Sequence, residues 1–450
     1  MREGLKETAV IFVSVVKWSV LAGVVGCAVG LSTTVFLKAL NWSTTTVTSF
    51  SYYYLLLPFA FFLSDLLIKY LAPDAEGHGT EKVIEAIHRR SGKIKAAVIP
   101  VKLVASVITV AFGGSAGKEG PCAQIGGGVA SVFSDIFRFD DADRKKLVIC
   151  GISAGFSSVF GTPIAGAIFG VEVLFVGGIL YDVLLPSFIA GVVGYHIART
   201  FGITYFYHPL DLVPSFQEYL LVKVIGAAVF FGFVSFLTVE AMRLLKGLAS
   251  RIKVWNPLKG LIGGLLLVVL TLIFSQRFLG FGVETIHSTL QGTKVGWDTF
   301  LLKIFFTAVT LNFGGSGGVI TPLLFIGATA GSALSNLLKL DPAMLSAIGL
   351  VSVLAGATNA PIASSIMAIE FFGAGIAPYA ALSCIISFLI TGHRSIYPSQ
   401  VLGIKKSPSI AVEVGKEISE IDPKVKPRRK SVVRAVLIMA RRVKEKVRKS

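Results

Sequence analysis

Residues 113–126 read GGSAGKEGPCAQIG, and residues 314–327 read GGSGGVITPLLFIG. Aligned with an offset of 201 residues (314 − 113), the two stretches share glycine, serine, proline and isoleucine positions. A second pair, TPIA at 162–165 and APIA at 360–363, follows in the same order at an offset of 198 (360 − 162). Two ordered matches at nearly one offset predict that the chain is built from two related halves.

Each glycine-rich stretch carries signals for the start of a helix. Pro121 and Pro322 suit the first position of a helix, where a missing N–H costs nothing, and Thr321 is a good N-cap, so helices are expected to start at Gly120-Pro121 and Thr321-Pro322. The glycines before them can adopt backbone conformations closed to other residues. Both helix starts would direct unpaired N–H groups and a partial positive charge at one region, which is a natural anion site. Broken segments of this kind mark the substrate site in transporters built from repeats, so we expect it at 113–128 and 314–331.

The composition is that of a membrane protein. Of the 450 residues, 53% are hydrophobic and only 15% are charged, and the mean hydropathy is +0.75. Soluble domains carry about 25% charged residues. Apolar stretches recur near the roughly 20 residues that cross a bilayer as a helix, and they lack the period of two that a β-barrel needs. The sequence therefore predicts an all-α integral membrane protein, with apolar segments at 9–40, 52–72, 97–116, 217–239, 258–275 and 377–391.

The predicted membrane domain spans 1–402, in halves of about 9–210 and 211–402, and a basic tail spans 403–450. Fifteen Lys/Arg and five Asp/Glu give the tail +10 (15 − 5) of the net charge of +17. Such charge is typical of cytoplasmic segments, so we expect a multi-pass protein of the plasma (inner) membrane, surrounded by lipid, with both termini inside. An adjacent membrane domain accounts for the charge, so nucleic acid is not an expected partner. Apolar residues at helical spacing over 432–447 indicate either an amphipathic helix or a solvated tail.

Glu119 lies between Lys118 and Gly120 in an apolar, glycine-rich segment. An ionisable residue in a membrane segment is a functional candidate, because burying it is costly. At an anion site its carboxylate can act as a tethered anion and swing away when it is protonated or displaced. Glu119 is therefore a candidate gate. The alternative is a structural ion pair with Lys118, although adjacent residues on a helix do not face each other.

Two further carboxylates, Glu172 and Glu370, each lie nine residues after the proline of the second repeat match. We expect a structural role, hydrogen bonding to neighbouring helix ends, with a role in transport as the alternative. The four cysteines and six histidines show no metal-ligand spacing, so neither a metal nor another cofactor is expected. The chain shows no nucleophile–base pair or facing carboxylates, so an enzyme is not expected either.

Four motifs in order resemble those of one family, the CLC chloride channels and chloride/proton exchangers. GKEGP at 117–121 resembles its G-[RK]-E-G-P motif, and GGVITP at 317–322 resembles its G-G-x-F-x-P motif. GTPIAG at 161–166, leading to Glu172, resembles a helix that ends in a family glutamate. SIY at 395–397 resembles the segment that carries an anion-coordinating tyrosine.

This resemblance covers about residues 9–402 and implies two inverted-topology helical repeats with broken helices meeting at a central anion site. It also implies a homodimer with one anion pathway per subunit. Glu119 would be the gating glutamate, and the Tyr397 hydroxyl, a sound donor, would bind the central anion. The other anion-binding positions that the resemblance implies are Gly117, Lys118, Gly120, Gly318, Val319 and Ile320.

The chain departs from the family pattern in three places. The GSGIP motif appears as GHGTE at 77–81, so His78, beside Gly79, stands where a serine would contact the anion. Its imidazole could donate to an anion and titrate near neutral pH, or point away and leave the contact to Thr80. Val173 stands where exchangers carry an inner proton-relay glutamate. The long paired cytoplasmic regulatory domains of many relatives are not expected, as in prokaryotic-type members.

We therefore expect transport of chloride, or another small anion, through a glutamate-gated pathway. The missing glutamate at Val173 favours a channel or a weakly coupled transporter. A chloride/proton antiporter, in which protons are a second partner, is the alternative. Export of fluoride, as in a related subfamily that also alters the serine position, is a lesser alternative.

Overall fold

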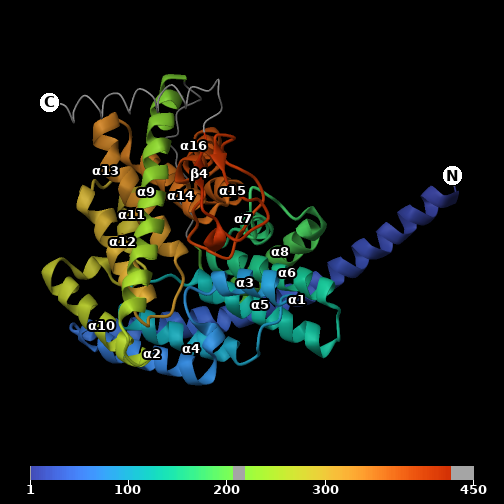
Figure 1. The fold of residues 1–450 in the computed structure, drawn as a ribbon, viewed down its shortest axis with the longest axis horizontal. Helices are drawn as coiled ribbons and strands as arrows, with labels where there is room; N and C mark the ends of the chain where they lie inside the picture. Colours follow the sequence, from blue (N-terminus) through green and yellow to red (C-terminus); the bar gives the residue numbers. More distant parts are fainter. Residues whose placement is uncertain (1, 206–217, 427–450) are drawn as a thin grey trace.

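The structure, a computed structural model, describes residues 2–205 and 218–426 and is almost entirely helical (Figure 1). The first half contains α1 (Arg2–Thr48), α2 (Leu57–Leu71), α3 (Thr80–Arg89), α4 (Val98–Ala111), α5 (Glu119–Ile136), α6 (Asp141–Phe160), α7 (Pro163–Glu172) and α8 (Leu184–Thr200). The second half contains α9 (Glu218–Arg251), α10 (Asn256–Ile273), α11 (Val283–Leu290), α12 (Trp297–Asn312), α13 (Ile320–Leu338), α14 (Pro342–Thr358), α15 (Pro361–Phe372) and α16 (Ala377–Thr391). The same order of eight helices thus occurs twice.

Seven helical segments of the described chain are long and apolar enough to cross a membrane. They are Glu3–Thr48, Tyr53–Leu71, Tyr181–Thr200, Glu218–Arg251, Asn256–Ile273, Ile320–Leu338 and Ala374–Thr391. Shorter apolar helices, α4, α7, α14 and α15, lie between them. The predicted all-α membrane protein is confirmed. The first turns of α1 are exposed and project away from the other helices (Figure 1).

The two halves are related by matching contacts as well as by helix order. Lys102 in α4 donates to two backbone carbonyls before α3, at 3.1 and 2.5 Å. Lys303 in α12, 201 residues later (303 − 102), donates to two carbonyls before α11, at 3.0 and 2.9 Å. Both lysines are fully buried. One local structure is therefore built twice, once in each half.

Other matching contacts cross from one half to the other. The backbone N–H of Ser316 donates to Thr109 Oγ1 at 2.9 Å, and the N–H of Ser115 donates to Thr310 Oγ1 at 3.0 Å. Each contact maps onto the other when the halves are exchanged, as a two-fold relation requires. This agrees with the predicted pair of inverted repeats.

Close packing within each half depends on glycine. A Cβ at Gly126 in α5 would collide with the backbone carbonyl of Gly151 in α6. In the second half, a Cβ at Gly327 in α13 would collide with the carbonyl of Gly349 in α14. Small residues let membrane helices approach closely. These two helix pairs form the rigid base from which the starts of α5 and α13 extend.

The described chain also contains four two-residue strands, one after α7 and three after α16. β1 (Phe175–Val176) pairs in parallel with β2 (Val401–Leu402), and β3 (Ile410–Ala411) pairs antiparallel with β4 (Lys424–Val425). Residues 403–426 therefore pack against the membrane helices. The expected amphipathic helix at 432–447 lies outside the described residues.

Candidate anion-binding site

The two glycine-rich segments meet at the centre of the molecule. The N–H of Gly117 donates to the carbonyl of Gly318 at 2.7 Å, and the N–H of Gly318 donates back at 2.6 Å. This antiparallel bridge joins equivalent positions of the two repeats. A Cβ on either glycine would collide with the carboxylate of Glu119. A side chain at Gly117 would displace the Glu119 carboxylate, and one at Gly318 would also collide with the backbone nitrogen of Gly120.

Glu119 places its carboxylate at the start of α13. Oε1 accepts a hydrogen bond from the backbone N–H of Ile320 at 2.5 Å, and Oε2 accepts one from the hydroxyl of Thr321 at 2.7 Å. The residue is fully buried. A helix N-terminus offers free N–H groups and a partial positive charge, which favour an anion. The carboxylate therefore lies where the start of α13 offers hydrogen-bond donors to an anion.

Two details differ from the expected helix starts. α5 begins at Glu119 and α13 at Ile320, so each proline lies two residues inside its helix. Thr321 is not the N-cap, which is Val319. Its hydroxyl donates to Glu119 instead, a contact that sequence reasoning missed. Its place beside a proline at the start of a helix is the signal that could have indicated it.

The loop before α3 approaches the same point. Gly79 has a φ of +76°, which favours glycine, and a Cβ there would collide with the carbonyl of Gly120. A Cβ on Gly120 would collide with the carbonyl of His78. The predicted positions Gly79, Gly120 and Gly318 thus lie together, and the backbone of His78 touches the start of α5.

Among the described residues, Nδ1 of His78 and the hydroxyl of Tyr397 are buried without a hydrogen bond of good geometry, although the Tyr397 hydroxyl lies beside the side chain of Thr80. The two rings lie 5.8 Å apart, centroid to centroid. Burying an unpaired polar group is costly, so such groups call for an explanation. A small anion would accept a hydrogen bond from the Tyr397 hydroxyl. The nitrogen of His78 could donate as well in the tautomer that carries its proton there.

Two cavities include residues near Glu119 in their walls, although Glu119 itself is in neither wall. The first, which we call the basic cavity, has a volume of about 320 Å³ and includes His78 in its wall. Its wall carries Arg243, Lys246 and Arg394, with Glu240 paired to Arg394 at 2.6 Å. Residues 418–423 supply part of the wall as well. An excess of positive charge in such a cavity raises the local concentration of anions.

The second cavity has a volume of about 120 Å³ and is lined by Lys118, Thr321 and Tyr205, among others. Lys118 lies 6.0 Å from the ring of Phe281. No ion pair joins Lys118 to Glu119 in the part of the chain that the structure describes. The geometry therefore favours Glu119 as a tethered anion over the alternative of a structural pair with Lys118.

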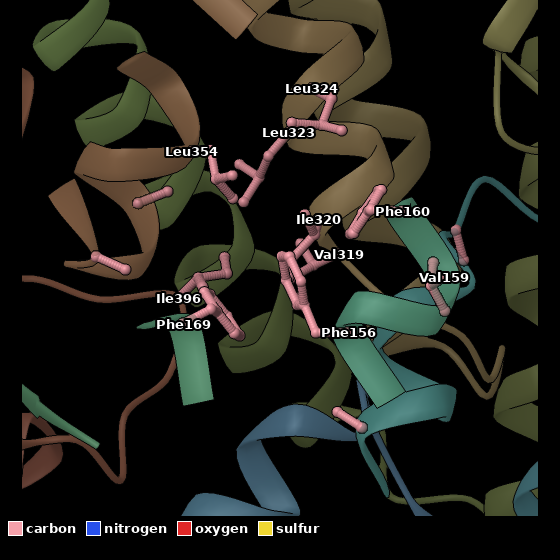
Figure 2. Close-up of a cluster of buried hydrophobic side chains, with 14 of the residues drawn as sticks. Phe156, Val159, Phe160, Phe169, Val319, Ile320, Leu323, Leu324, Leu354 and Ile396 are labelled. Carbon is pink, nitrogen blue, oxygen red and sulfur yellow. The ribbon is translucent and has the colours of Figure 1, made fainter. Parts of the chain in front are cut away.

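Apolar side chains surround the carboxylate. Figure 2 shows the side chains of Val319 and Ile320 beside Phe156, in a cluster that also contains Phe160. Val319 and Ile320 are each 1% exposed. The backbone N–H of Ile320 donates to Glu119, while the side chains of both residues are buried in this cluster. Electrostatic interactions are stronger in such a low-dielectric setting than in water.

The other predicted carboxylates lie at different helix ends. Glu172 accepts from the two N–H groups at the start of α15, at 3.0 and 2.8 Å. Glu370 accepts from the two N–H groups at the start of α7, also at 3.0 and 2.8 Å. The two contacts are equivalent under exchange of the halves. Val173 is fully buried, and its carbonyl accepts from Gln400 at 2.7 Å.

Comparisons with known proteins agree on one family. The family described as "Voltage gated chloride channel" matches residues 59–392. The chain is 36% identical over 399 residues to the "Chloride/fluoride channel protein" of Pseudomonas syringae pv. tomato, with 87% of this chain and 88% of the relative covered. The crystal structure of a CLC-type fluoride/proton antiporter matches with a TM-score of 0.82 at 27% identity, covering 86% of this chain and 98% of that one. A slow cyanobacterial chloride/proton antiporter matches in fold, with a TM-score of 0.72 at 21% identity, covering 83% and 94%.

Proposed function

Because the chain belongs to the family of voltage-gated chloride channels, we propose that it moves chloride across the membrane through a pathway that Glu119 gates. One observation carries the proposal. The carboxylate of Glu119 accepts the hydrogen bonds of Ile320 and Thr321 that a bound anion would otherwise accept. A tethered anion and a mobile anion compete for the same donors, so the pathway is closed while Glu119 holds them.

The gate opens when the side chain leaves the start of α13. Protonation removes the charge that holds it there, and a mobile anion can displace it. Chloride then faces the Ile320 N–H and the Thr321 hydroxyl, while the Tyr397 hydroxyl offers a further donor. The site supplies dipoles and no fixed cation in contact, so binding is weak enough for the ion to leave again.

A second part of the proposal concerns whether chloride transport is coupled to the movement of protons. Val173 offers no titratable group, which supports a channel or a weakly coupled transporter. The alternative is a chloride/proton antiporter, the activity named for an H(+)/Cl(−) exchange transporter of Klebsiella pneumoniae that is 25% identical over 389 residues.

Fluoride is the second candidate substrate. The relative from Pseudomonas is named for both chloride and fluoride, and the matched crystal structure is that of a fluoride/proton antiporter. His78 supports this candidate, because its unpartnered nitrogen lies where the chain departs from the chloride-type motif. An N–H donor on an aromatic ring could stabilise a small anion that holds its charge tightly.

We further propose that the protein works as a homodimer in the plasma (inner) membrane, surrounded by lipid, with both termini cytoplasmic. Residues 1–402 would form the transport domain and 403–450 the basic tail. Exposed apolar side chains on α1, α2, α9, α10 and α16 support a lipid or subunit environment for those faces. The basic cavity would then open toward the cytoplasm, since residues of the tail line it.

The test is flux from liposomes that contain the purified protein. Liposomes loaded with potassium chloride or potassium fluoride are diluted into buffer without that anion, and efflux and external pH are followed. We expect chloride efflux well above that of liposomes without protein. If fluoride leaves the liposomes and chloride does not, the substrate is fluoride and not chloride. If neither anion leaves, the proposal is wrong.

A further inference from the structure

Glu81 is a carboxylate that the proposed pathway does not use. It lies in the first turn of α3, three residues after His78. Oε1 accepts hydrogen bonds from the backbone N–H and the hydroxyl of Ser399, at 3.0 and 2.6 Å. Oε2 is buried and has no partner among the described residues. Glu81 can therefore take up a proton on Oε2 without giving up a hydrogen bond.

The position of Glu81 links the basic cavity to the anion site. Ser399, its partner, lies two residues after Tyr397, and Pro398 between them forms part of the cavity wall. The rings of Tyr397 and His78, 5.8 Å apart, carry the unpartnered polar atoms described above, and His78 also lines the basic cavity.

Other carboxylates of the membrane domain differ from Glu81 either in their hydrogen bonds or in their place. The buried Glu119 and Glu172 and the half-buried Glu370 each use both oxygens to accept hydrogen bonds from groups at a helix start. Asp65 in α2 also has one buried oxygen without a partner, but it lines a separate cavity with Glu76. Glu81 therefore combines a free oxygen with a position beside the anion site.

The charged groups that face Glu81 come from two helices. Lys246 of α9, in the wall of the basic cavity, favours the charged carboxylate. Glu85, one turn along α3, opposes it, and Glu85 is itself paired with Lys82 at 3.0 Å. Neither makes a salt bridge to Glu81 in the described chain. Glu81 itself is not in the wall of the basic cavity, but His78 and Pro398, close to it and to its partner Ser399 in the chain, are.

We propose that Glu81 carries protons between the basic cavity and Glu119. A proton from water in the cavity bonds to Oε2 of Glu81 and passes by water, along His78 and Tyr397, to the carboxylate of Glu119 once that side chain has left α13. In each transfer one O–H bond breaks at the donor and one forms at the acceptor. The inference rests on the proposed gating role of Glu119. In it, Glu81 supplies the proton-carrying acid that is missing at Val173.

The experiment measures proton and chloride fluxes together in liposomes, driven by a chloride gradient. Glu81→Gln removes the exchangeable proton but keeps an oxygen to accept from Ser399. We expect it to lower proton flux by about tenfold or more, because a positioned acid is lost. Chloride flux should stay within about twofold of the wild type, since the anion site is untouched. Glu81→Asp should retain proton flux, and Asp65→Asn serves as the matched buried-acid control.

Three results would overturn the role of Glu81. The first is that Glu81→Gln has the same proton flux as the wild type. The second is that Asp65→Asn loses as much proton flux as Glu81→Gln. The third is that the wild type conducts chloride without moving protons. In all three, chloride transport itself would stand. Absence of chloride flux in the wild type would overturn the proposed function, and this inference with it.

Discussion

The hydrogen bond between Thr321 and Glu119 is the smallest unit of the proposed gate. It joins residues 202 positions apart, at 2.7 Å, in a fully buried setting. The sequence was enough to single out Glu119 as a candidate gate, because a carboxylate in an apolar segment is costly to bury, and its gating role stays a prediction. The role of Thr321 could not be predicted, because its contact exists only after the two halves pair. The same holds for Glu81, whose partner Ser399 lies 318 positions away.

Replacement of Thr321 by valine should loosen the gate. Valine keeps the shape but removes the donor, and a hydrogen bond to a charged group contributes about 1.5–3 kcal/mol. We expect chloride efflux at neutral pH to rise, but by less than the roughly tenfold that the lost bond alone would give, because the mobile anion loses the same donor. Thr329→Val, in the same helix but bonded to its own backbone, is the control. Equal chloride efflux in the two variants would show that the Thr321 hydroxyl does not hold Glu119 in the closed position.

Replacement of His78 by serine tests the anion preference. The substitution removes a buried ring nitrogen that has no partner in the described chain and restores the hydroxyl of the family motif. We expect the ratio of fluoride to chloride efflux to fall roughly fivefold, which corresponds to about one hydrogen bond. His196→Ser, at an exposed position of α8, should leave the ratio unchanged. If both variants match the wild type, His78 does not select the anion.

At the scale of the elements, the glycine and proline pattern predicted where broken helices begin to within two residues. The composition predicted the apolar helices, and the offset of 201 residues predicted that two segments would be equivalent. The relative direction of the halves was an expectation from the resemblance alone. The reciprocal bonds of Gly117 and Gly318 supply the physical basis, because an antiparallel bridge between equivalent residues relates the halves by a two-fold rotation.

The buried lysines Lys102 and Lys303 should stabilise the loops before α3 and α11. Each donates to two backbone carbonyls that would otherwise be buried without a partner. We expect Lys102→Met and Lys303→Met each to lower the free energy of unfolding by about 1–3 kcal/mol. Thermal unfolding in detergent measures this, with Lys38→Met on the exposed face of α1 as control. A melting temperature equal to that of the control would contradict the role.

At the scale of the whole molecule, the segment after β2 is fastened to the membrane domain by an ion pair. Arg89 at the end of α3 donates to Glu417 at 2.7 and 2.5 Å. This contact joins a residue of the predicted tail to the first half, and neither composition nor spacing indicated it. The segment also lines the basic cavity, so its position shapes the route to the anion site.

The strength of the Arg89–Glu417 ion pair should depend on pH. The hydrogen bond from Arg89 lowers the pKa of Glu417 below its usual value. The stability that the Arg89–Glu417 pair contributes is therefore complete above about pH 4.3, the pKa of an ordinary glutamate. It is lost as the pH falls through the lower pKa of Glu417 in the folded protein. Hydrogen exchange of residues 410–425 should show less protection in Arg89→Gln than in the wild type at pH 7. The difference should vanish at acidic pH, and a difference that persists there would contradict the assignment.

The central claim is that the carboxylate of Glu119 competes with chloride for the start of α13, and chloride efflux as a function of pH tests it most directly. In the wild type, efflux should rise as the pH falls, because protonation releases the side chain from Ile320 and Thr321. In Glu119→Gln, which carries no charge to be removed, efflux should be high and independent of pH. The wild-type dependence on pH, retained in Glu119→Gln, would contradict the account.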